Sequence, residues 1–379
     1  MSDVGSQTRT HGDSPLRLVV VLGTRAQTIK MAPLLAEMER AGLPYQLLMT
    51  GQHRETICDL LNEFGVQTEK QWLYKGQEIK GIGQAVKWML STFWQLWRLR
   101  RQWAPRPSHL TIVLAHGDTF STVLAAAAGR LAGAQVAHVE AGLRSFNWRQ
   151  PFPEELNRIL VTRLAQIAYC PGEWACGNLN PRKLQIVDTQ GNTILDALRT
   201  ALAKTSAVRR DSEQPHAVAS IHRFENLYSR QRFGIVLDTL QKLSQHLRVI
   251  VVLHPVTRKR LIELGELEKL ERNPRIELMP RMTYLPFIRL IGQARMVITD
   301  GGSNQEELSY LGVPTLLMRM ATERQEGLGE NVVLSRFDET VVDAFIAEVL
   351  DAKAEVHLRQ LPDFQPVSII VEDLRERLK

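Results

Sequence analysis

Residues 16–41, LRLVVVLGTRAQTIKMAPLLAEMERA, decide the fold class of this chain. The run 16–22 is apolar at most positions and rich in valine, which is typical of a strand buried in a parallel sheet. A short turn at 23–25 follows, and a helical pattern then runs from about residue 26 to residue 41. Strand, turn and helix in this order are the first half of a βαβ unit, so the sequence predicts an α/β fold.

The same alternation continues along the chain and restarts once. Two series of βα units predict two open parallel sheets joined by a hinge near Gly191, with a cleft between them. We expect an N-terminal Rossmann-like domain at 16–190 and a C-terminal one at 191–365. Residues 1–15 are predicted to be a disordered leader, and 366–379 a helix for which packing back on the N-terminal domain is one arrangement. The further strands are expected at 45–49, 110–115, 135–139, 167–170, 217–221, 248–253, 276–278, 296–299 and 315–318.

The composition agrees with two globular domains. A length of 379 residues exceeds one typical domain, and 44% hydrophobic with 23% charged residues excludes a mainly disordered or disulfide-scaffold chain. The net charge of +6 favours anionic ligands and leaves nucleotide phosphates, nucleic acid and a membrane surface open. The three cysteines have no CxxC or zinc-site spacing, so we expect reduced thiols, and residues 1–15 lack the apolar core of a signal peptide.

Residues 87–103 hold four of the seven tryptophans and end in a basic cluster. One interpretation is an amphipathic helix at a membrane interface. The other, which the apolar periodicity favours, is a helix packed on the sheet or on another subunit. No apolar run is long enough to span a bilayer, so we expect no membrane insertion. The basic run 258–260 lacks interleaved aromatic residues, so we expect no nucleic-acid partner either.

The first strand ends in a turn without the GxGxxG pattern of dinucleotide-binding proteins, which disfavours a hydride-transfer enzyme. Gly23, Arg25 and Lys30 instead combine a glycine turn, a helix N-terminus and two cations, which together suit an anion. The alternative is an ordinary βα turn with a solvated arginine.

A second candidate anion site lies at 300–307, between a predicted strand and a helix. Gly301, Gly302 and Ser303 would let the backbone approach a diphosphate closely at the helix N-terminus. Glu307, one turn further, is better placed for ribose hydroxyls, and Arg319 after the next strand could add a phosphate contact. The alternative is a tight glycine turn followed by solvated helix charges.

Carboxylates follow successive strands of the first series. Asp118 and Glu140 each come directly after a strand, and Glu154 begins a helix. Carboxylates that converge in one cleft can divide acid and base roles when their environments separate their pKa values. Metal binding is a competing interpretation, but the ligand spacing is missing, so we expect no metal. Asp118 and Glu154 could also serve only as helix caps or first-turn charges.

Two histidines, His222 and His254, follow strands of the second series, each in a segment rich in arginine. A histidine at a strand end that faces the cleft could bind or protonate a phosphate leaving group. A lone histidine is more often structural, but two at equivalent places favour a functional role.

Taken together, these motifs resemble the non-hydrolysing UDP-N-acetylglucosamine 2-epimerases. The likeness runs in order from about residue 16 to residue 333. Each motif is modest by itself, whereas the ordered set is highly specific. The stretches that carry it are 23–34, 50–55, 116–119, 138–144, 153–158, 191–193, 222–226, 254–260 and 305–307.

The resemblance implies a GT-B-like fold of two Rossmann-like domains with UDP in a deep interdomain cleft and no cofactor. The implied reaction interconverts UDP-GlcNAc and UDP-ManNAc by anti elimination of UDP to 2-acetamidoglucal and re-addition, supplying ManNAc units for bacterial surface polysaccharide. It also implies a cytoplasmic homodimer. By motif position, Asp118, Glu140 and Glu154 look like the catalytic carboxylates, and His222 looks like the histidine that steadies departing UDP. The implied substrate-site positions are Arg25, Lys30, His254, Gly301, Gly302, Ser303, Glu307 and Arg319.

This chain also departs from the family pattern. Ala26 and Gln27 replace the usual Pro-Glu, and Asp300–Ser303 reads DGGS where DSGG is common. Gln52 and Glu55 match a region that binds an allosteric UDP-GlcNAc in some members, but the expected downstream arginine is not obvious. Four hypotheses stay open: this epimerase or one for another UDP-2-acetamido sugar, a hydrolysing epimerase that releases ManNAc and UDP, a glycosyltransferase, and an inactive UDP-sugar sensor.

Overall fold

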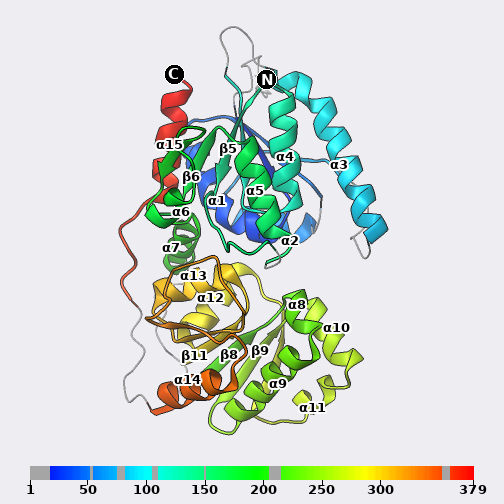
Figure 1. Cartoon of the computed structure of the whole chain (residues 1–379), viewed down its shortest axis with the longest axis vertical. Coiled ribbons are helices and arrows are strands. Elements are labelled where there is room, and N and C mark those ends of the chain that lie inside the picture. The colour runs from blue at the N-terminus through cyan, green and yellow to red at the C-terminus, as the bar shows by residue number, and fades with distance from the viewer. Residues whose placement is uncertain are drawn as a thin grey trace, which may run out of the picture.

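The computed structural model describes residues 18–51, 54–74, 82–104, 110–148, 151–204, 215–351 and 359–379. The chain forms two parallel sheets, and helices connect their successive strands. The two sheets with their helices make up the upper and lower halves of Figure 1. The predicted α/β class with two Rossmann-like units is confirmed. The chain passes from one sheet to the other between Asp188 and His216, and the predicted division at residue 191 stays a prediction.

The N-terminal sheet has seven described strands in the order β3-β2-β1-β4-β5-β6-β7, all paired in parallel. Every residue of β1 is buried, as expected for a central strand with helices on both faces. The strands are β1 (Leu18–Leu22), β2 (Tyr45–Met49), β3 (Lys70–Trp72), β4 (Ile112–His116), β5 (Gln135–Val139), β6 (Ile167–Cys170) and β7 (Gln185–Asp188).

The C-terminal sheet has six described strands in the order β10-β9-β8-β11-β12-β13, also parallel. Both sheets therefore have the 3-2-1-4-5-6 strand order of a Rossmann fold. The strands are β8 (His216–Ser220), β9 (Arg248–Leu253), β10 (Ile276–Pro280), β11 (Met296–Thr299), β12 (Thr315–Leu317) and β13 (Val332–Leu334).

Three short strands, β3, β7 and β13, were not expected from the sequence. All three lie at an edge of their sheet, and each contains residues that are only partly buried. An edge strand is covered on fewer sides than a central one, so it needs no continuous apolar run. The hydrophobic pattern therefore finds the central strands and the edge strand β10 but misses β3 and β7. β13 is apolar throughout and is missed because it has only three residues.

Helices cover both faces of the N-terminal sheet. Leu18, Val20 and Leu22 point into a core shared with α1, α2, α7 and α15, while Val19 and Val21 point into a second core with α3 and α4. The helices of this half are α1 (Arg25–Arg40), α2 (Arg54–Glu63), α3 (Ile82–Trp103), α4 (Phe120–Leu131), α5 (Glu154–Leu164), α6 (Glu173–Gly177) and α7 (Ile194–Lys204). The others are α8 (Phe224–Leu227), α9 (Arg230–Ser244), α10 (Pro255–Glu263), α11 (Leu267–Glu271), α12 (Tyr284–Gln293), α13 (Gly302–Leu311), α14 (Glu339–Asp351) and α15 (Pro366–Arg377).

The last helix, α15, lies beside the N-terminal sheet in Figure 1. Its buried residues Ile370 and Leu374 belong to the same core as α1. The Tyr169 hydroxyl donates to Asp373 over 2.7 Å and adds a polar contact between β6 and this helix.

The tryptophan-rich segment forms α3, which packs beside α4. Leu96 and Trp103 are fully buried in the core beneath it. Val86, Leu90 and Trp94 lie four residues apart and are 50%, 60% and 62% exposed, so they form an apolar stripe on the outer face of the helix. Within the described part of the chain, we find no helix with the length and hydropathy needed to cross a membrane.

The strand order also determines where a ligand can bind. In each sheet the connections leave in opposite directions from two adjacent strands, β1 and β4 in one and β8 and β11 in the other. Such a switch point opens a crevice at the carboxyl ends of these strands. The segments that follow these four strands carry most of the residues singled out by the sequence.

Candidate active site

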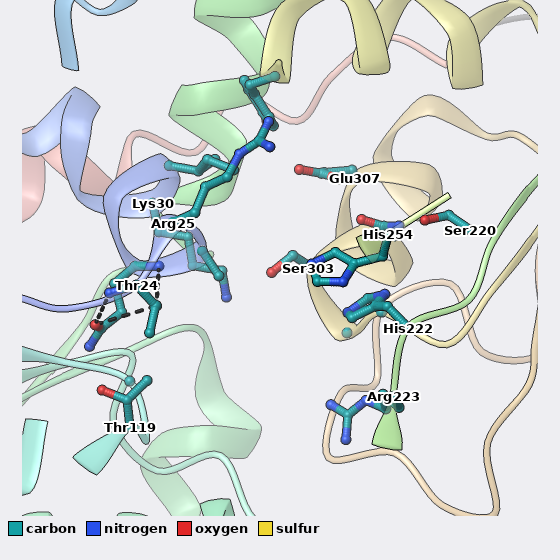
Figure 2. Close-up of a pocket in the computed structure, with 18 of the residues that line it drawn as sticks. Thr24, Arg25, Lys30, Thr119, Ser220, His222, Arg223, His254, Ser303 and Glu307 are labelled. Atoms are coloured by element: carbon teal, nitrogen blue, oxygen red, sulfur yellow. Dashed lines mark hydrogen bonds between the residues drawn. The ribbon is translucent and has the colours of Figure 1, made fainter. Parts of the chain in front are cut away.

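A cavity of about 440 Å³ lies between the two domains, where the two switch points face each other. In Figure 2, Thr24, Arg25 and Lys30 stand on one side and His222, His254 and Ser303 on the other. Its volume falls in the usual range for a small-molecule site. The predicted residues that line it are Arg25, Lys30, Asp118, Glu140, Glu154, His222, His254, Gly301, Gly302, Ser303 and Glu307.

The turn after β1 is held by Gln27, a buried side chain that uses both ends of its amide. Its oxygen accepts from the backbone N–H groups of Gly23 and Thr24 over 3.0 and 3.1 Å, and its nitrogen donates to the His116 carbonyl over 2.7 Å. A Cβ on Gly23 would collide with the Ser121 hydroxyl, so this position needs glycine. Gln27 thus joins the two βα turns of the N-terminal switch point.

Arg25 reaches across the cleft, where its guanidinium donates to the Met282 carbonyl over 2.6 Å. Burial, with a contribution from the charge of Arg281, lowers the pKa of Arg25 to about 10. It stays charged at neutral pH, and Arg281 also lines the cavity. Two guanidinium groups near each other make this part of the cavity strongly attractive to an anion.

Glu140 is enclosed by cations from both domains. Lys30 Nζ lies 2.5 Å from Glu140 Oε2, and Arg324 Nη2 donates to Oε1 over 2.7 Å. Lys30 also lies 3.2 Å from Glu306 of α13, which ties the two domains together. Burial opposes ionisation of Glu140, but Lys30 and Arg324 hold its pKa well below the ordinary value.

A second buried carboxylate, Glu323, forms ion pairs with arginines of both domains. It accepts from Arg158 of α5 over 3.1 Å, from Arg319 over 2.8 Å and from Arg324. Despite its burial, these guanidinium groups hold its pKa well below the usual range. Arg319 is not among the described residues that line the cavity, so its place is behind the wall, where it supports Glu323.

The network residues Arg158, Glu306, Glu323 and Arg324 were not chosen as site residues from the sequence. Arg324 and Lys30 both contact Glu140 and Glu306, and the partners in these four contacts are 18 to 276 positions apart in the chain. In the sequence they look like ordinary helix and loop charges. The one sequence signal for Arg158 and Glu306 is that they lie in segments 153–158 and 305–307, which carry the family resemblance.

Asp118 and Glu154 line the cavity and, like Glu140, come from the N-terminal domain. Asp118 Oδ2 accepts from Arg158 over 2.5 Å. Glu154 Oε2 is buried, and no hydrogen-bond donor among the described residues reaches it. Burial raises the pKa of Glu154; the charge of Arg223 opposes this shift, and the nearby charge of Asp118 adds to it.

On the opposite side, buried Asp300 organises the turn after β8. It accepts from the backbone N–H groups of His222 and Arg223 over 3.0 and 2.9 Å and from the Asn226 amide over 3.1 Å. The His222 ring lies with Nδ1 3.2 Å from Asp300 and its centroid 5.7 Å from that of His254. Both histidines therefore face the cavity together.

The N-terminus of α13 opens onto the cavity between Gly301 and Ser303. Gly301 provides no side-chain cap, so the first N–H groups of the helix are available to an anion. A Cβ on Gly302 would lie 2.8 Å from Arg324 Nη1, which explains the second glycine. Ser303 points into the cavity in Figure 2.

Glu307 lies one turn further along α13 and is 2% exposed. Burial raises its pKa to about 8, with smaller opposing effects from a hydrogen bond with Tyr284 and from cations. A buried carboxyl of this kind suits sugar hydroxyl groups better than phosphate, because it can accept or donate according to its proton.

Two remaining expectations concern regulation and metals. Gln52 lies outside the described residues, as does the side chain of Glu55. Among the residues that are described, no three His, Cys, Asp or Glu side chains are grouped so as to hold a metal ion.

The cavity thus places three carboxylates of one domain opposite a helix N-terminus and two histidines of the other. The second group suits a diphosphate, since it combines backbone donors, imidazoles and nearby guanidinium groups. The first group suits proton transfer to and from a carbon or oxygen atom.

Comparisons with known proteins agree with this chemistry. A family model described as UDP-N-acetylglucosamine 2-epimerase matches residues 36–363. The chain is 31% identical over 353 residues to a "Probable UDP-N-acetylglucosamine 2-epimerase" of Ralstonia solanacearum, covering 87% of this chain and 88% of that protein. It is 29% identical over 348 residues to the UDP-N-acetylglucosamine 2-epimerase of Methanocaldococcus jannaschii, covering 87% and 91%.

A solved structure shows the same architecture. The Methanocaldococcus jannaschii UDP-GlcNAc 2-epimerase, in complex with UDP-GlcNAc and UDP, superposes with a TM-score of 0.79 at 25% identity. The superposition covers 95% of this chain and 100% of that one. The predicted GT-B-like arrangement of two Rossmann-like domains is therefore confirmed.

Proposed function

Because the chain belongs to the UDP-N-acetylglucosamine 2-epimerase family, we propose that it interconverts UDP-GlcNAc and UDP-ManNAc without net hydrolysis. A base takes the proton from sugar C2, the C2–H electron pair forms the C1=C2 bond, and UDP departs with the C1–O electrons. UDP then adds back to C1 of the 2-acetamidoglucal while C2 receives a proton on the opposite face. No external oxidant or cofactor is required, because every atom and electron is returned.

The placement of the leaving group is supported by the C-terminal wall of the cavity. The diphosphate is proposed to lie at the N-terminus of α13, against Gly301, Gly302 and Ser303. His222 and His254 are proposed to stabilise the charge that develops on departing UDP. Arg25 and Lys30 add positive charge from the opposite domain, and Glu307 receives the ribose hydroxyls.

One observation carries the proposal: a single cavity at two opposed switch points joins three carboxylates to a diphosphate-type site. Elimination at C2 needs both parts together, because the proton and the leaving group depart from neighbouring carbon atoms. A sensor would need only the nucleotide part. Asp118, Glu140 and Glu154 are therefore proposed to form the carboxylate part of the site, where the C2 proton is removed and returned.

Proton NMR in deuterated water tests the proposal. The purified chain, given UDP-GlcNAc, should form UDP-ManNAc and replace the C2 hydrogen by deuterium, whereas the triple variant Asp118→Asn, Glu140→Gln, Glu154→Gln should do neither. Free UDP and ManNAc in stoichiometric amounts would select the hydrolysing reaction instead. Absence of both exchange and product would refute the activity for this substrate, and a panel of other UDP-2-acetamido sugars would then identify the one used.

The chain is further proposed to act as a homodimer in the cytoplasm, supplying ManNAc units for surface polysaccharide. Val86, Leu90 and Trp94 support self-association, because an exposed apolar stripe on a helix is suited to a partner surface. The three free cysteines are compatible with a reducing compartment. Sedimentation velocity at micromolar concentrations measures the oligomeric state directly.

A further inference from the structure

The three carboxylates of the cavity differ in how many cations hold them, and Glu140 is held on both oxygens. Its Oε2 lies 2.5 Å from Lys30 and 3.3 Å from His116 Nε2, and its Oε1 lies 2.7 Å from Arg324. A proton could bind Glu140 only by displacing a buried lysine or arginine from its partner. Such a carboxylate is well suited to hold cations in place and poorly suited to accept a proton.

Asp118 is held on one oxygen only, as far as the described residues show. Arg158 Nη2 lies 2.5 Å from Asp118 Oδ2, and the same guanidinium is shared with Glu323 at 3.1 Å. The Asp118 side chain lines the cavity and retains 22% exposure. The ion pair leaves the other carboxylate oxygen to face the cavity.

Glu154 has the least support of the three. No described residue donates a hydrogen bond to its buried Oε2. The charged groups that act on it are Arg223 after β8, Asp118 after β4 and Glu225 at the start of α8, together with its own backbone N–H. Burial raises its pKa, so the neutral form of this carboxyl is favoured more than that of an exposed glutamate.

We propose that Asp118 and Glu154 carry the protons on the two faces of sugar C2, and that Glu140 is a positioning residue that stays ionised. This inference rests on the proposed epimerase activity. Inversion at C2 needs one group that removes the proton and a second that returns one on the opposite face. A pair of carboxyl groups that share one proton can do both when their environments differ.

Inversion at C2 balances when Asp118 and Glu154 together hold one proton. In one direction, ionised Asp118 takes the C2 proton as the C1=C2 bond forms and UDP leaves with the C1–O electrons. Neutral Glu154 then gives its proton to C2 from the other face as UDP adds back to C1. The pair ends with the proton on Asp118, and exchange with water resets it. The reverse reaction exchanges the two roles.

Glu140 has a different task in this scheme. Lys30 comes from α1 and Arg324 from the C-terminal domain, and Glu140 holds both through opposite oxygens. Their cationic groups are thereby fixed at the cavity wall beside the proposed diphosphate site. Loss of Glu140 should consequently slow exchange of the C2 hydrogen equally for both sugars, since the same leaving group departs from each.

Exchange of the C2 hydrogen with deuterated water distinguishes these roles when each sugar is supplied separately. Asp118→Asn and Glu154→Gln should each slow interconversion by about 10²- to 10⁴-fold, the usual loss for a proton-transfer group. Each should retain exchange with one of the two sugars only, and the retained sugar should differ between the variants. Glu140→Gln should slow exchange of both sugars by the same factor.

Interconversion by Glu154→Gln within tenfold of the wild-type rate would overturn the assignment. So would one-sided exchange in Glu140→Gln. If the wild type exchanges neither sugar, the proposed epimerase activity itself fails, so the two failures are distinguishable.

The pH dependence of turnover gives a second test. The pH at which turnover falls does not depend on how much of a variant folds, so a poorly folding variant can still be used. Deprotonation of Glu154 should produce the alkaline limb, the fall in turnover at high pH. Glu154→Asp should therefore move this limb to lower pH by at least about 0.4 units, the difference between the ordinary pKa values of glutamate and aspartate. Glu140→Asp is the matched control and should leave the limb in place, because residue 140 is ionised throughout. A limb that moves in the control, or does not move in Glu154→Asp, would overturn the assignment.

Discussion

Replacing Glu307 by glutamine should stabilise the protein at alkaline pH. The carboxyl group is buried in α13, and burial raises its pKa from 4.5 to about 8. The folded state therefore binds the proton more tightly than the unfolded state does. As the pH rises from 4.5 to about 8, the unfolded chain loses this proton first, and the free energy of unfolding falls.

The size of the effect follows from the shift. A difference of 8 − 4.5 = 3.5 pKa units, at about 1.36 kcal/mol each, amounts to about 5 kcal/mol above pH 8. Glutamine is neutral at every pH and avoids this cost. Near pH 5, where Glu307 is neutral too, the variant and the wild type should agree within about 1 kcal/mol. At pH 9 the variant should unfold at least about 10 °C higher, because 1 kcal/mol is worth about 2–4 °C in a domain of this size.

Thermal unfolding of both proteins at pH 5 and pH 9 measures this directly. Other buried acids, such as Glu326 with a pKa raised to about 7, contribute equally to both proteins and cancel in the difference. A stability difference that is the same at both pH values would refute the reasoning, as would a variant that is less stable at pH 9. If Glu307 binds ribose as proposed, UDP affinity at pH 9 should also fall by about 10- to 100-fold, the loss expected for a charge-assisted hydrogen bond.

Three further predictions concern the cleft and the exposed helix face. His222→Ala should lower turnover at least about 100-fold with a change in Tm below about 2 °C, because 40% of this side chain is exposed; parallel losses would indicate a structural role. Glu323→Gln should lower the free energy of unfolding by about 3 kcal/mol in urea titrations, because three buried guanidinium groups then surround a neutral amide; unchanged stability would contradict the ion-pair account. Trp94→Lys should weaken self-association at least about tenfold in sedimentation velocity, since it places a charge on the apolar stripe; an unaltered profile would place the dimer contact elsewhere.

Local patterns in the sequence were enough to predict the central part of the fold. Strands such as 18–22 and 112–116 are buried on both faces, so burial alone imposes a run of apolar residues that is visible in one dimension. The edge strands β3 and β7 escaped prediction because partial coverage allows mixed sequences, and β13 escaped because its apolar run is only three residues long. The turns that follow the central strands were recognised from glycines and charges. Of the twelve catalytic and substrate-site residues predicted on these turns and on the helices after them, eleven line the cavity.

The sequence by itself therefore determined two parallel βα series and the side chains presented at their strand ends, since both depend on contacts within a few residues. Only the tertiary structure decided how these side chains are paired. Lys30, Glu140 and Arg324 are far apart in the chain. Lys30 meets Glu140 because β1 and β5 belong to one sheet, and Arg324 meets Glu140 because the two sheets face each other. These contacts also make Glu140 and Glu154 different from each other. Glu140 is held by two cations, whereas no described residue donates a hydrogen bond to Glu154 Oε2. Ionisation follows the charges that surround a group in space, and the order of residues along the chain does not specify those charges.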